Sequence, residues 1–251
     1  MSGLMRQDLY AELYQVENTH WWHQHKRAVC HQRISRMKIG KVLDIGAGTG
    51  KILEELKQKN WQVKGVDTEP VAAQECKKRG IILQTCDVGN QSLPYQSNSF
   101  DLVLILDFLE HVQNEIQVIN EIKRVLKPEG KLLISVPAYP RLYSYWDKML
   151  GHYRRYSKAD LTQLIKKSGL KIEFLSYYFS WLLLPAVIIR MIKKMFNIKM
   201  ISDFQTNTNN FLILFTIKIL SKIELLLLKY INLPFGLSLI CVASTQKKYQ
   251  S

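Results

Sequence analysis

The sequence has few cysteines, and their placement argues against the usual structural uses of this residue. Only four occur among 251 residues, with no CxxC pair and no neighbouring histidine cluster: Cys30, Cys76, Cys86 and Cys241. Neither a zinc site nor a disulfide framework is therefore expected, and no metal site is predicted. The chain opens with a polar stretch of mixed charge, which is not the pattern of a secretory signal. These features fit a reducing compartment and predict a cytoplasmic protein.

Acidic residues are also scarce, and the resulting positive charge is unevenly distributed. The chain has 35 Lys and Arg against 21 Asp and Glu, a formal net charge of +14. Residues 171–251 hold ten of the cations and three of the acids, and they form the most apolar third of the chain. A segment that is both basic and apolar favours an anionic membrane surface over nucleic acid as its partner.

What the sequence does contain is a glycine-rich turn between a strand pattern and a helix pattern. Residues 42–50 read Val-Leu-Asp-Ile-Gly-Ala-Gly-Thr-Gly, and a helical pattern follows at once over residues 51–57. A strand, a glycine turn and a helix form the first half of a nucleotide-binding βαβ unit. Glycine is required in such a turn because side chains would keep a ligand away from the backbone.

Acids beside this turn narrow the choice of ligand. A second predicted strand, residues 62–67, ends in Asp67, 21 residues after Gly46, an offset suited to a carboxylate that binds ribose hydroxyls. Asp44 lies inside the first strand, where it would repel a pyrophosphate but not a cationic group. The spacing is GxGxG, whereas dinucleotide sites use GxGxxG. This combination resembles the first motif, (D/E)xGxGxG, of the class I S-adenosylmethionine-dependent methyltransferases.

Further segments match that family in the same order along the chain. A third strand is predicted to end in Thr-Cys-Asp-Val at 85–88, a fourth covers 99–107, and residues 108–112 are similar to the family's "EHV" segment. A helix over 114–126, a turn at 127–130 and a fifth strand at 131–136 follow. The resemblance covers roughly residues 10–180 and 236–245, and it concerns the fold and the cofactor without specifying an acceptor.

The resemblance implies S-adenosylmethionine as cofactor, with S-adenosylhomocysteine as product. It implies a cofactor site formed by Asp44, Gly46, Ala47, Gly48, Gly50, Asp67, Thr68, Asp87, Val88, Leu106 and Trp22. The alternation of strands and helices predicts an α/β fold, a seven-stranded, mostly parallel, doubly wound Rossmann-like sheet. Most of these residues fall at predicted strand ends, which is where such sheets bind their ligands.

The segment before the glycine turn is predicted to be helical over residues 4–37, with an interruption at Asn18-Thr19. It contains the run His20-Trp-Trp-His-Gln-His-Lys-Arg27. In similar methyltransferases an N-terminal helix covers the bound cofactor. Trp21 and Trp22 therefore either contact the cofactor or pack the helix onto the sheet. The histidines at 20, 23 and 25 do not share one helical face, which argues against metal binding.

Two loops beyond the fifth strand, residues 137–147 and 151–157, are positioned to touch the acceptor. A general base for an oxygen acceptor could come from His152 in the second loop or from His111 after the fourth strand. Arg154 and Arg155 either clamp an anionic group or neutralise surface acids. Ser157 with Asp160 predicts a capping box for a helix over 158–167.

An insertion of about sixty residues separates the predicted sixth strand, residues 170–176, from the seventh, residues 237–243. Three parts are thus expected: a methyltransferase core with its helical lid over 1–180, a helical insertion over 181–235, and a final strand and tail over 236–251. The insertion has two apolar helical segments, 181–196 and 211–231, with cations at Arg190, Lys193, Lys194, Lys218, Lys222 and Lys229. Helices lying in the membrane interface are favoured over a helical pair packed together or a homodimer contact, and a transmembrane span, which needs about 20 apolar residues, is disfavoured.

The sequence therefore predicts an enzyme that transfers a methyl group from S-adenosylmethionine to a small or lipid-linked acceptor, at oxygen, on the inner face of the membrane. Two alternatives stay open. A nucleic-acid methyltransferase would suit the charge of +14, but residues 107–110 lack the (N/D)PP(Y/F) motif of base amino methylation. A non-catalytic scaffold that retains the cofactor-binding fold is the other alternative.

Overall fold

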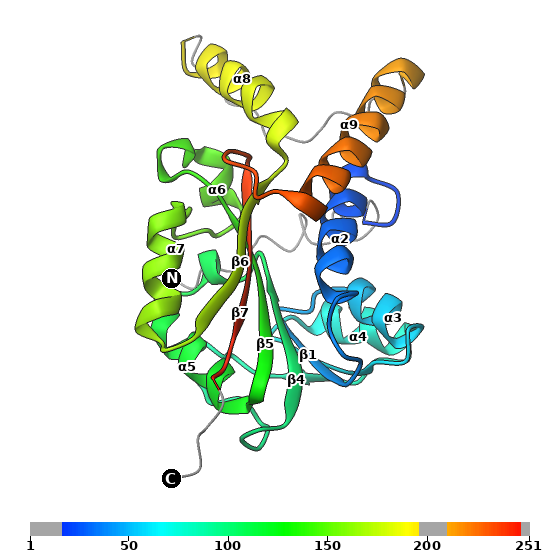
Figure 1. Cartoon of the computed structure of the whole chain (residues 1–251), viewed down its shortest axis with the longest axis vertical. Coiled ribbons are helices and arrows are strands. Elements are labelled where there is room, and N and C mark those ends of the chain that lie inside the picture. Colours follow the sequence, from blue (N-terminus) through cyan, green and yellow to red (C-terminus); the bar gives the residue numbers. More distant parts are fainter. Residues whose placement is uncertain (1–16, 196–209, 247–251) are drawn as a thin grey trace.

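A central sheet of seven strands organises the molecule (Figure 1). The computed structural model describes residues 17–195 and 210–246. The strands lie in the order β3-β2-β1-β4-β5-β7-β6, with β7 antiparallel to both β5 and β6. The prediction of an α/β fold with a seven-stranded, mostly parallel sheet is confirmed. The strand bounds are β1 Lys41–Ile45, β2 Gln62–Asp67, β3 Leu83–Thr85, β4 Phe100–Leu106, β5 Leu126–Pro137, β6 Lys171–Tyr178 and β7 Ser238–Ser244.

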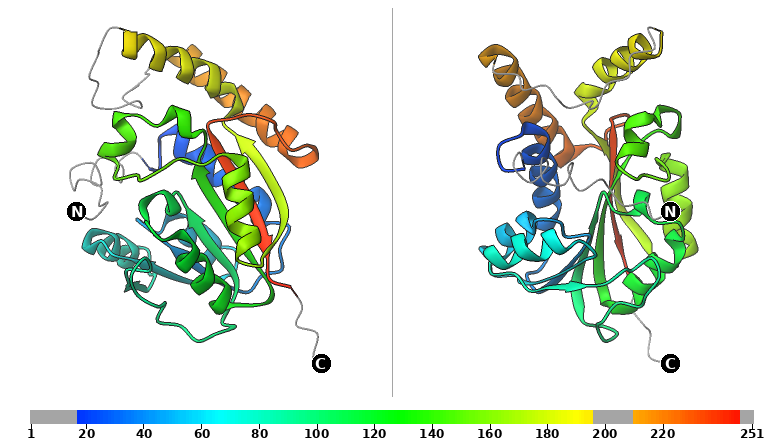
Figure 2. Two further views of the ribbon diagram at one scale, coloured as in Figure 1. Left: turned by 90° about the vertical axis from the view of Figure 1, so that its left-hand side faces the viewer. Right: turned by 180° about the vertical axis from the view of Figure 1, so that it is seen from behind.

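Helices cover both faces of the sheet, as Figure 1 and the right-hand view of Figure 2 show. Strands enclosed in this way must be apolar on both faces, and residues 102–105 of β4 are completely buried. One face carries α2 (Trp21–Ile34), α3 (Lys51–Lys57) and α4 (Pro70–Lys78). The other carries α5 (Glu115–Val125), α6 (Tyr145–Met149) and α7 (Lys158–Lys167).

The topology places a ligand site at the carboxyl edge of β1 and β4. From β1 the chain builds outward through β2 and β3, and from β4 it builds in the opposite direction, so the strand order reverses between these two neighbours. The loops leaving β1 and β4 diverge at this switch point, which is where open α/β sheets bind ligands. The predicted cofactor residues are therefore expected to meet at this edge.

Most predicted elements have the expected bounds to within two residues. The helix over 158–167 begins with the predicted capping box, in which the Ser157 side chain and the Asp160 carboxylate bond each other's backbone N–H groups. Two details differ. Strand β3 ends at Thr85, so Asp87 lies in the following loop. The turn predicted at 127–130 falls inside β5, where the pairing with β4 jumps from Leu126 to Lys131 and the intervening residues bulge out.

The predicted break in the N-terminal helix is present. Residues 17–19 form a turn, and the His20 side chain caps α2 by accepting the Trp22 N–H at 3.3 Å. The part of the predicted helix before residue 17 lies outside the described residues.

The insertion before the last strand forms a short turn, η3 (Ser180–Leu182), and two helices, α8 (Leu183–Met195) and α9 (Phe211–Tyr230). Both helices project beyond the carboxyl edge of the sheet and diverge from one another (Figures 1 and 2). The base of α9 is bound to α2 by side-chain donors on backbone carbonyls: Gln32 to Leu225 at 2.6 Å and Arg33 to Leu228 at 2.8 Å. No helix within the described ranges combines the length and hydrophobicity needed to traverse a bilayer.

Candidate active site

The glycine turn after β1 has a left-handed backbone that other residues adopt only rarely. Gly46, Gly48 and Gly50 have φ angles of 71°, 52° and 72°. A Cβ on Gly46 would lie 2.6 Å from the Phe108 ring, and one on Gly50 would lie 2.6 Å from the Cys76 sulfur. A Cβ on Gly48 would meet nothing within 4 Å among the described residues. Gly46 and Gly50 therefore allow close packing, while Gly48 leaves one side of the turn open to a ligand.

Two acids border this open side. Asp44 is buried in β1, and its Oδ1 atom has no hydrogen-bond partner within residues 17–195 and 210–246. Asp67, at the end of β2, accepts the Gly48 N–H at 2.8 Å and the Glu69 N–H at 3.0 Å. Burial, together with the nearby Asp67 carboxylate, raises the pKa of Asp44 to about 8. A buried acceptor of this kind suits a ligand that brings a cationic donor, so these residues fit the ammonium group of S-adenosylmethionine.

The other predicted cofactor residues also follow the carboxyl ends of neighbouring strands. Thr68 is exposed directly after β2, and Leu106 is half-buried at the end of β4. Asp87 lies in the loop after β3, where its carboxylate accepts the Gly89 N–H at 3.1 Å and an Asn90 side-chain N–H at 2.8 Å. Val88 beside it is buried. The fold thus brings these side chains to one edge of the sheet, and their contact with the cofactor stays a prediction.

Trp21 and Trp22 belong to an aromatic cluster under the insertion. The Trp22 ring stacks on Phe179 with 3.8 Å between centroids and 10° between planes. Trp21 lies edge-on to Phe179 and 5.6 Å from the Trp181 ring. The two tryptophans therefore pack α2 against the residues that follow β6, as one of the two predicted roles requires. A contact of Trp22 with the cofactor stays a prediction.

A charged pair that the sequence did not suggest lies beside the end of β4. Lys26 on α2 donates to the Asp107 carboxylate at 2.6 Å, and the Ser135 hydroxyl donates to the same carboxylate at 2.8 Å. Ser135 also bonds the buried Tyr178 hydroxyl at 2.7 Å. Burial opposes the ionisation of Asp107, but Lys26 and Ser135 outweigh it and lower the pKa of this carboxyl. An ionised carboxylate is thereby held at the edge of the site.

Backbone strain marks the same edge. Three residues other than glycine have positive φ where successive strands end: Asp107 directly after β4 (53°), Tyr139 two residues after β5 (61°) and Phe179 directly after β6 (57°). Such conformations cost on the order of 1–3 kcal/mol each and gather at functional sites. Tyr139 stacks on Tyr177, with 5.4 Å between centroids and 12° between planes.

The two arginines of the second acceptor loop both have acidic partners within the chain. Arg155 donates to the fully buried Asp147 at 2.7 Å, and Arg154 pairs with Glu115. Burial alone would raise the pKa of Asp147, but His152 and Arg155 hold it well below its usual range. Of the two predicted roles, the structure thus shows the one in which Arg154 and Arg155 neutralise acidic side chains. One of these acids, Asp147, is buried and does not lie on the surface.

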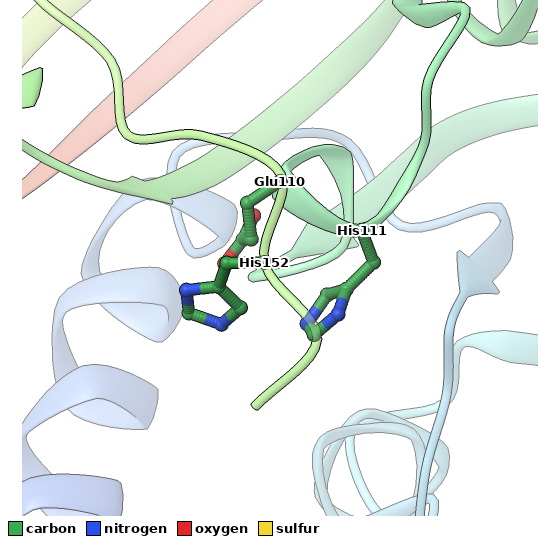
Figure 3. A group of neighbouring side chains, drawn as sticks. All are labelled: Glu110, His111 and His152. Atoms are coloured by element: carbon green, nitrogen blue, oxygen red, sulfur yellow. The ribbon is translucent and has the colours of Figure 1, made fainter. Parts of the chain in front are cut away.

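The two candidate bases, His111 and His152, come together with Glu110 (Figure 3). The imidazole rings meet edge to face with 4.7 Å between centroids. Glu110 and His111 lie in the short turn η1 (Leu109–His111) after β4, and His152 comes from the loop after α6. The Tyr153 N–H donates to the Glu110 carbonyl at 2.7 Å and joins the two segments. Sequence spacing alone did not indicate this group.

Comparison with known families decides the classification. The family model described as "Methyltransferase domain" matches residues 21–174, more than half of the chain. The chain belongs to this family. This membership agrees with the resemblance to the class I S-adenosylmethionine-dependent methyltransferases. The match covers every strand from β1 to β5 together with the Glu110, His111 and His152 group.

Relatives of this chain differ in the substrates or biosynthetic routes that their names give. A demethylmenaquinone methyltransferase of Tropheryma whipplei is 31% identical over 166 residues, which cover 64% of this chain and 65% of that protein, just under two thirds of its length. A ubiquinone biosynthesis O-methyltransferase of Haemophilus ducreyi is 36% identical over 104 residues, 38% of this chain and 44% of that protein. A solved Thermotoga maritima methyltransferase, described as a possible histamine N-methyltransferase, superposes with a TM-score of 0.61 at 17% identity over 95% of this chain and 96% of that one, which supports the fold alone.

Proposed function

We propose that this protein transfers the methyl group of S-adenosylmethionine to a hydroxyl of a small lipid-linked acceptor at an anionic membrane surface. The observation that carries the membrane part of the proposal is the exposed apolar surface of α8 and α9. These helices project from the same edge of the sheet that holds the candidate site. The names of two relatives, a demethylmenaquinone methyltransferase and an O-methyltransferase of ubiquinone biosynthesis, agree with a lipid-linked acceptor.

The exposed surface of the insertion is unusually apolar. Fifteen of the twenty exposed large hydrophobic side chains in the described residues fall between Leu184 and Phe235. They include Phe211 at 75% and Tyr230 at 80% exposure. Apolar patches of this kind on soluble proteins mark interaction sites.

The arrangement of side chains around α9 suits a membrane interface. At about 100° per residue, six of its nine exposed large apolar residues fall within an arc of roughly 80°: Leu212, Phe215, Ile219, Ile223, Leu226 and Tyr230. The exposed Lys218, Lys222 and Lys229 fall within roughly 40° beside this arc, between it and the face that contacts α2. A helix with this arrangement buries its apolar face among the lipids and directs its lysines toward anionic head groups. This charge pattern favours a bilayer over an apolar protein partner.

The site residues have defined roles in this proposal. Asp44 accepts a hydrogen bond from the ammonium group of the cofactor, and the open side of Gly48 lets the cofactor approach the backbone. Asp67 accepts hydrogen bonds from the ribose, and Asp87 accepts one from the adenine. The sulfonium is already a strong electrophile, so the protein contributes chiefly by aligning the acceptor oxygen, the methyl carbon and the sulfur. His152 or His111 takes up the hydroxyl proton directly or through the group they form with Glu110.

Calorimetric titration with S-adenosylmethionine and S-adenosylhomocysteine, with and without phosphatidylglycerol vesicles, tests the proposal. We expect saturable micromolar binding of both, and co-sedimentation of the protein with phosphatidylglycerol vesicles but not with phosphatidylcholine vesicles. With radiolabelled cofactor and vesicles that carry a hydroxylated quinone, label should enter the organic phase. Absence of cofactor binding under all these conditions would overturn the proposal.

A pair of matched variants isolates the membrane contact. The double change Phe215→Asp and Ile219→Asp should abolish sedimentation with vesicles while leaving cofactor binding unchanged. The control is Ile82→Asp, an exposed apolar residue remote from the insertion. If the double variant sediments as the wild type does, α9 does not insert into lipid.

A further inference from the structure

Glu110, His111 and His152 form a compact group of potential metal ligands. Each of the three side chains offers a ligand atom, and these atoms all lie within 4.8 Å of one another. Figure 3 shows Glu110 and His111 extending from adjacent positions of η1 toward the ring of His152. Ligands on opposite sides of an ion with bonds of about 2.1 Å lie about 4.2 Å apart, so the spread of the group is close to what a metal requires.

Glu110 supplies the independent sign that a ligand belongs here. Its side chain is fully buried, and neither of its carboxylate oxygens has a hydrogen-bond partner in the part of the chain that the structure describes. Two cations close to it are committed elsewhere, since Lys26 pairs with Asp107 and Arg155 pairs with Asp147. An unpaired buried carboxylate is costly, and a bound cation would remove that cost.

A buried carboxylate orients the His152 ring. Its Nδ1 atom lies 3.1 Å from the buried Asp147 carboxylate, which also accepts from Arg155 and from the Ser144 N–H. Because this carboxylate also binds the Arg155 guanidinium, it is placed to accept a hydrogen bond from Nδ1 of His152, and in that tautomer Nε2 is the acceptor nitrogen. A carboxylate that fixes the tautomer and orientation of an imidazole in this way is the usual support of a metal-binding histidine.

We propose that Glu110, His111 and His152 bind one divalent first-row transition-metal ion, within the series from Mn²⁺ to Zn²⁺, at the acceptor end of the site. Two imidazoles and one carboxylate favour these ions over Mg²⁺ or Ca²⁺ and leave coordination positions open. The inference departs from the expectation, drawn from the spacing of cysteines and histidines, that the chain holds no metal. That spacing gave no sign of this group, because His111 and His152 are 41 positions apart in the sequence and only the fold brings their side chains together.

A role for the ion rests on the proposed function. With the ion bound, His111 and His152 would serve as its ligands and would no longer act as the base. An acceptor hydroxyl at an open coordination position would then lose its proton to solvent more readily, because the cation stabilises the oxyanion. The oxygen then forms a bond to the methyl carbon as the carbon–sulfur bond breaks. The sulfur keeps that electron pair, so oxyanion and sulfonium become a neutral ether and S-adenosylhomocysteine.

Titration of the metal-stripped, full-length protein with Mn²⁺, followed by electron paramagnetic resonance, tests the site, with Zn²⁺ as competitor. We expect one saturable Mn²⁺ site per chain that Zn²⁺ displaces. Glu110→Gln, His111→Ala and His152→Ala should each weaken Mn²⁺ binding at least tenfold. The matched control His31→Ala removes a histidine that pairs with Glu55 at the far end of α2 and should leave Mn²⁺ binding unchanged.

Folding of the variants is checked without metal. Gln is isosteric with the protonated form of Glu, so Glu110→Gln should keep the melting temperature of the metal-free protein and lose only the increase that Mn²⁺ gives the wild type. No saturable binding of Mn²⁺ or Zn²⁺, or binding that survives both Glu110→Gln and His152→Ala, would overturn the site.

The outcomes separate the metal site from the proposed function. Metal binding that depends on Glu110, in a protein that does not bind S-adenosylmethionine, would keep the site and overturn the function. Methyl transfer that continues unchanged after chelation would keep the function and overturn the role of the ion.

Discussion

At the scale of single residues, Asp44 couples cofactor binding to protons. With a pKa of about 8, this carboxyl is about 90% protonated at pH 7 when no cationic ligand is present. The ammonium group of the cofactor favours the ionised form, so binding at pH 7 should release close to one proton. The affinity should rise between pH 6 and pH 8 and then level off. Calorimetry at pH 7 in buffers of different ionisation enthalpy measures this release, and a binding enthalpy independent of the buffer would contradict it.

The same residue should also affect stability in the cofactor-free protein. The pKa of Asp44 is raised from the ordinary aspartic acid value of 3.8 to about 8, so the folded state binds this proton more tightly than the unfolded state does. Protonation of Asp44 therefore adds to the free energy of unfolding, fully below pH 3.8, and this contribution is lost as the pH rises toward 8. Asp44→Asn should therefore raise the melting temperature at pH 8 by several degrees and change it little near pH 4. Thermal unfolding followed by circular dichroism at the two pH values checks this.

Residues in the glycine turn could be predicted from the sequence because their constraints are local. Gly48 needs a positive φ and an open side, and both follow from a turn between a strand and a helix. The pairs that depend on the tertiary fold could not be predicted. Lys26 meets Asp107 across 81 positions, and nothing in either local pattern indicates the partner.

At the scale of elements, one buried pair joins the insertion to the core. Glu224 on α9 lies 2.5 Å from the His25 ring nitrogen on α2, and it accepts the Phe179 and Ser180 N–H groups at 2.9 and 2.6 Å. Glu224→Leu removes this acceptor and leaves buried donors unsatisfied, so it should lower the free energy of unfolding by about 3 kcal/mol. Chemical denaturation at pH 7 measures the loss. The exposed Lys222→Ala on the same helix is the control and should change the free energy by less than about 0.5 kcal/mol.

The acid dependence of this loss provides a second check. Burial would raise the pKa of Glu224, but the hydrogen bonds from His25 and Ser180 more than reverse this, and the pKa is lowered. The stabilisation is therefore complete above the ordinary pKa of 4.5 and decreases as the pH falls through the lowered value. A difference between wild type and Glu224→Leu that grows below pH 4 would contradict this account.

The bounds of most elements followed from periodicity and end signals, as the helix over 158–167 illustrates with its capping box. The exceptions have physical reasons. Strand β3 has only three residues and lies at the edge of the sheet, so the apolar pattern extends past the point where its pairing stops. The residues of the turn at 127–130 are included in β5 because the sheet tolerates a bulge there, and Glu129 adopts a positive φ of 62°.

At the scale of the whole molecule, the location of the positive charge should matter more than its total of +14. If α9 lies on the membrane, its Lys218, Lys222 and Lys229 each contribute about 1 kcal/mol to binding of an anionic bilayer. Changing all three to Gln should weaken binding to phosphatidylglycerol vesicles roughly a hundredfold, and high salt should weaken the wild type in the same direction. Vesicle sedimentation over a range of lipid concentrations measures the change.

The control for this charge effect is a second triple variant with the same net charge. Lys64, Lys166 and Lys167 are exposed on β2 and α7, away from the insertion, and their replacement by Gln removes three charges from the core. Vesicle binding of this variant should stay within a few fold of the wild type, because charges beyond a Debye length of about 10 Å from the head groups are screened. Equal weakening by both triple variants would mean that the protein binds membranes through its overall charge, without the orientation that brings the carboxyl edge of the sheet to a lipid-linked acceptor.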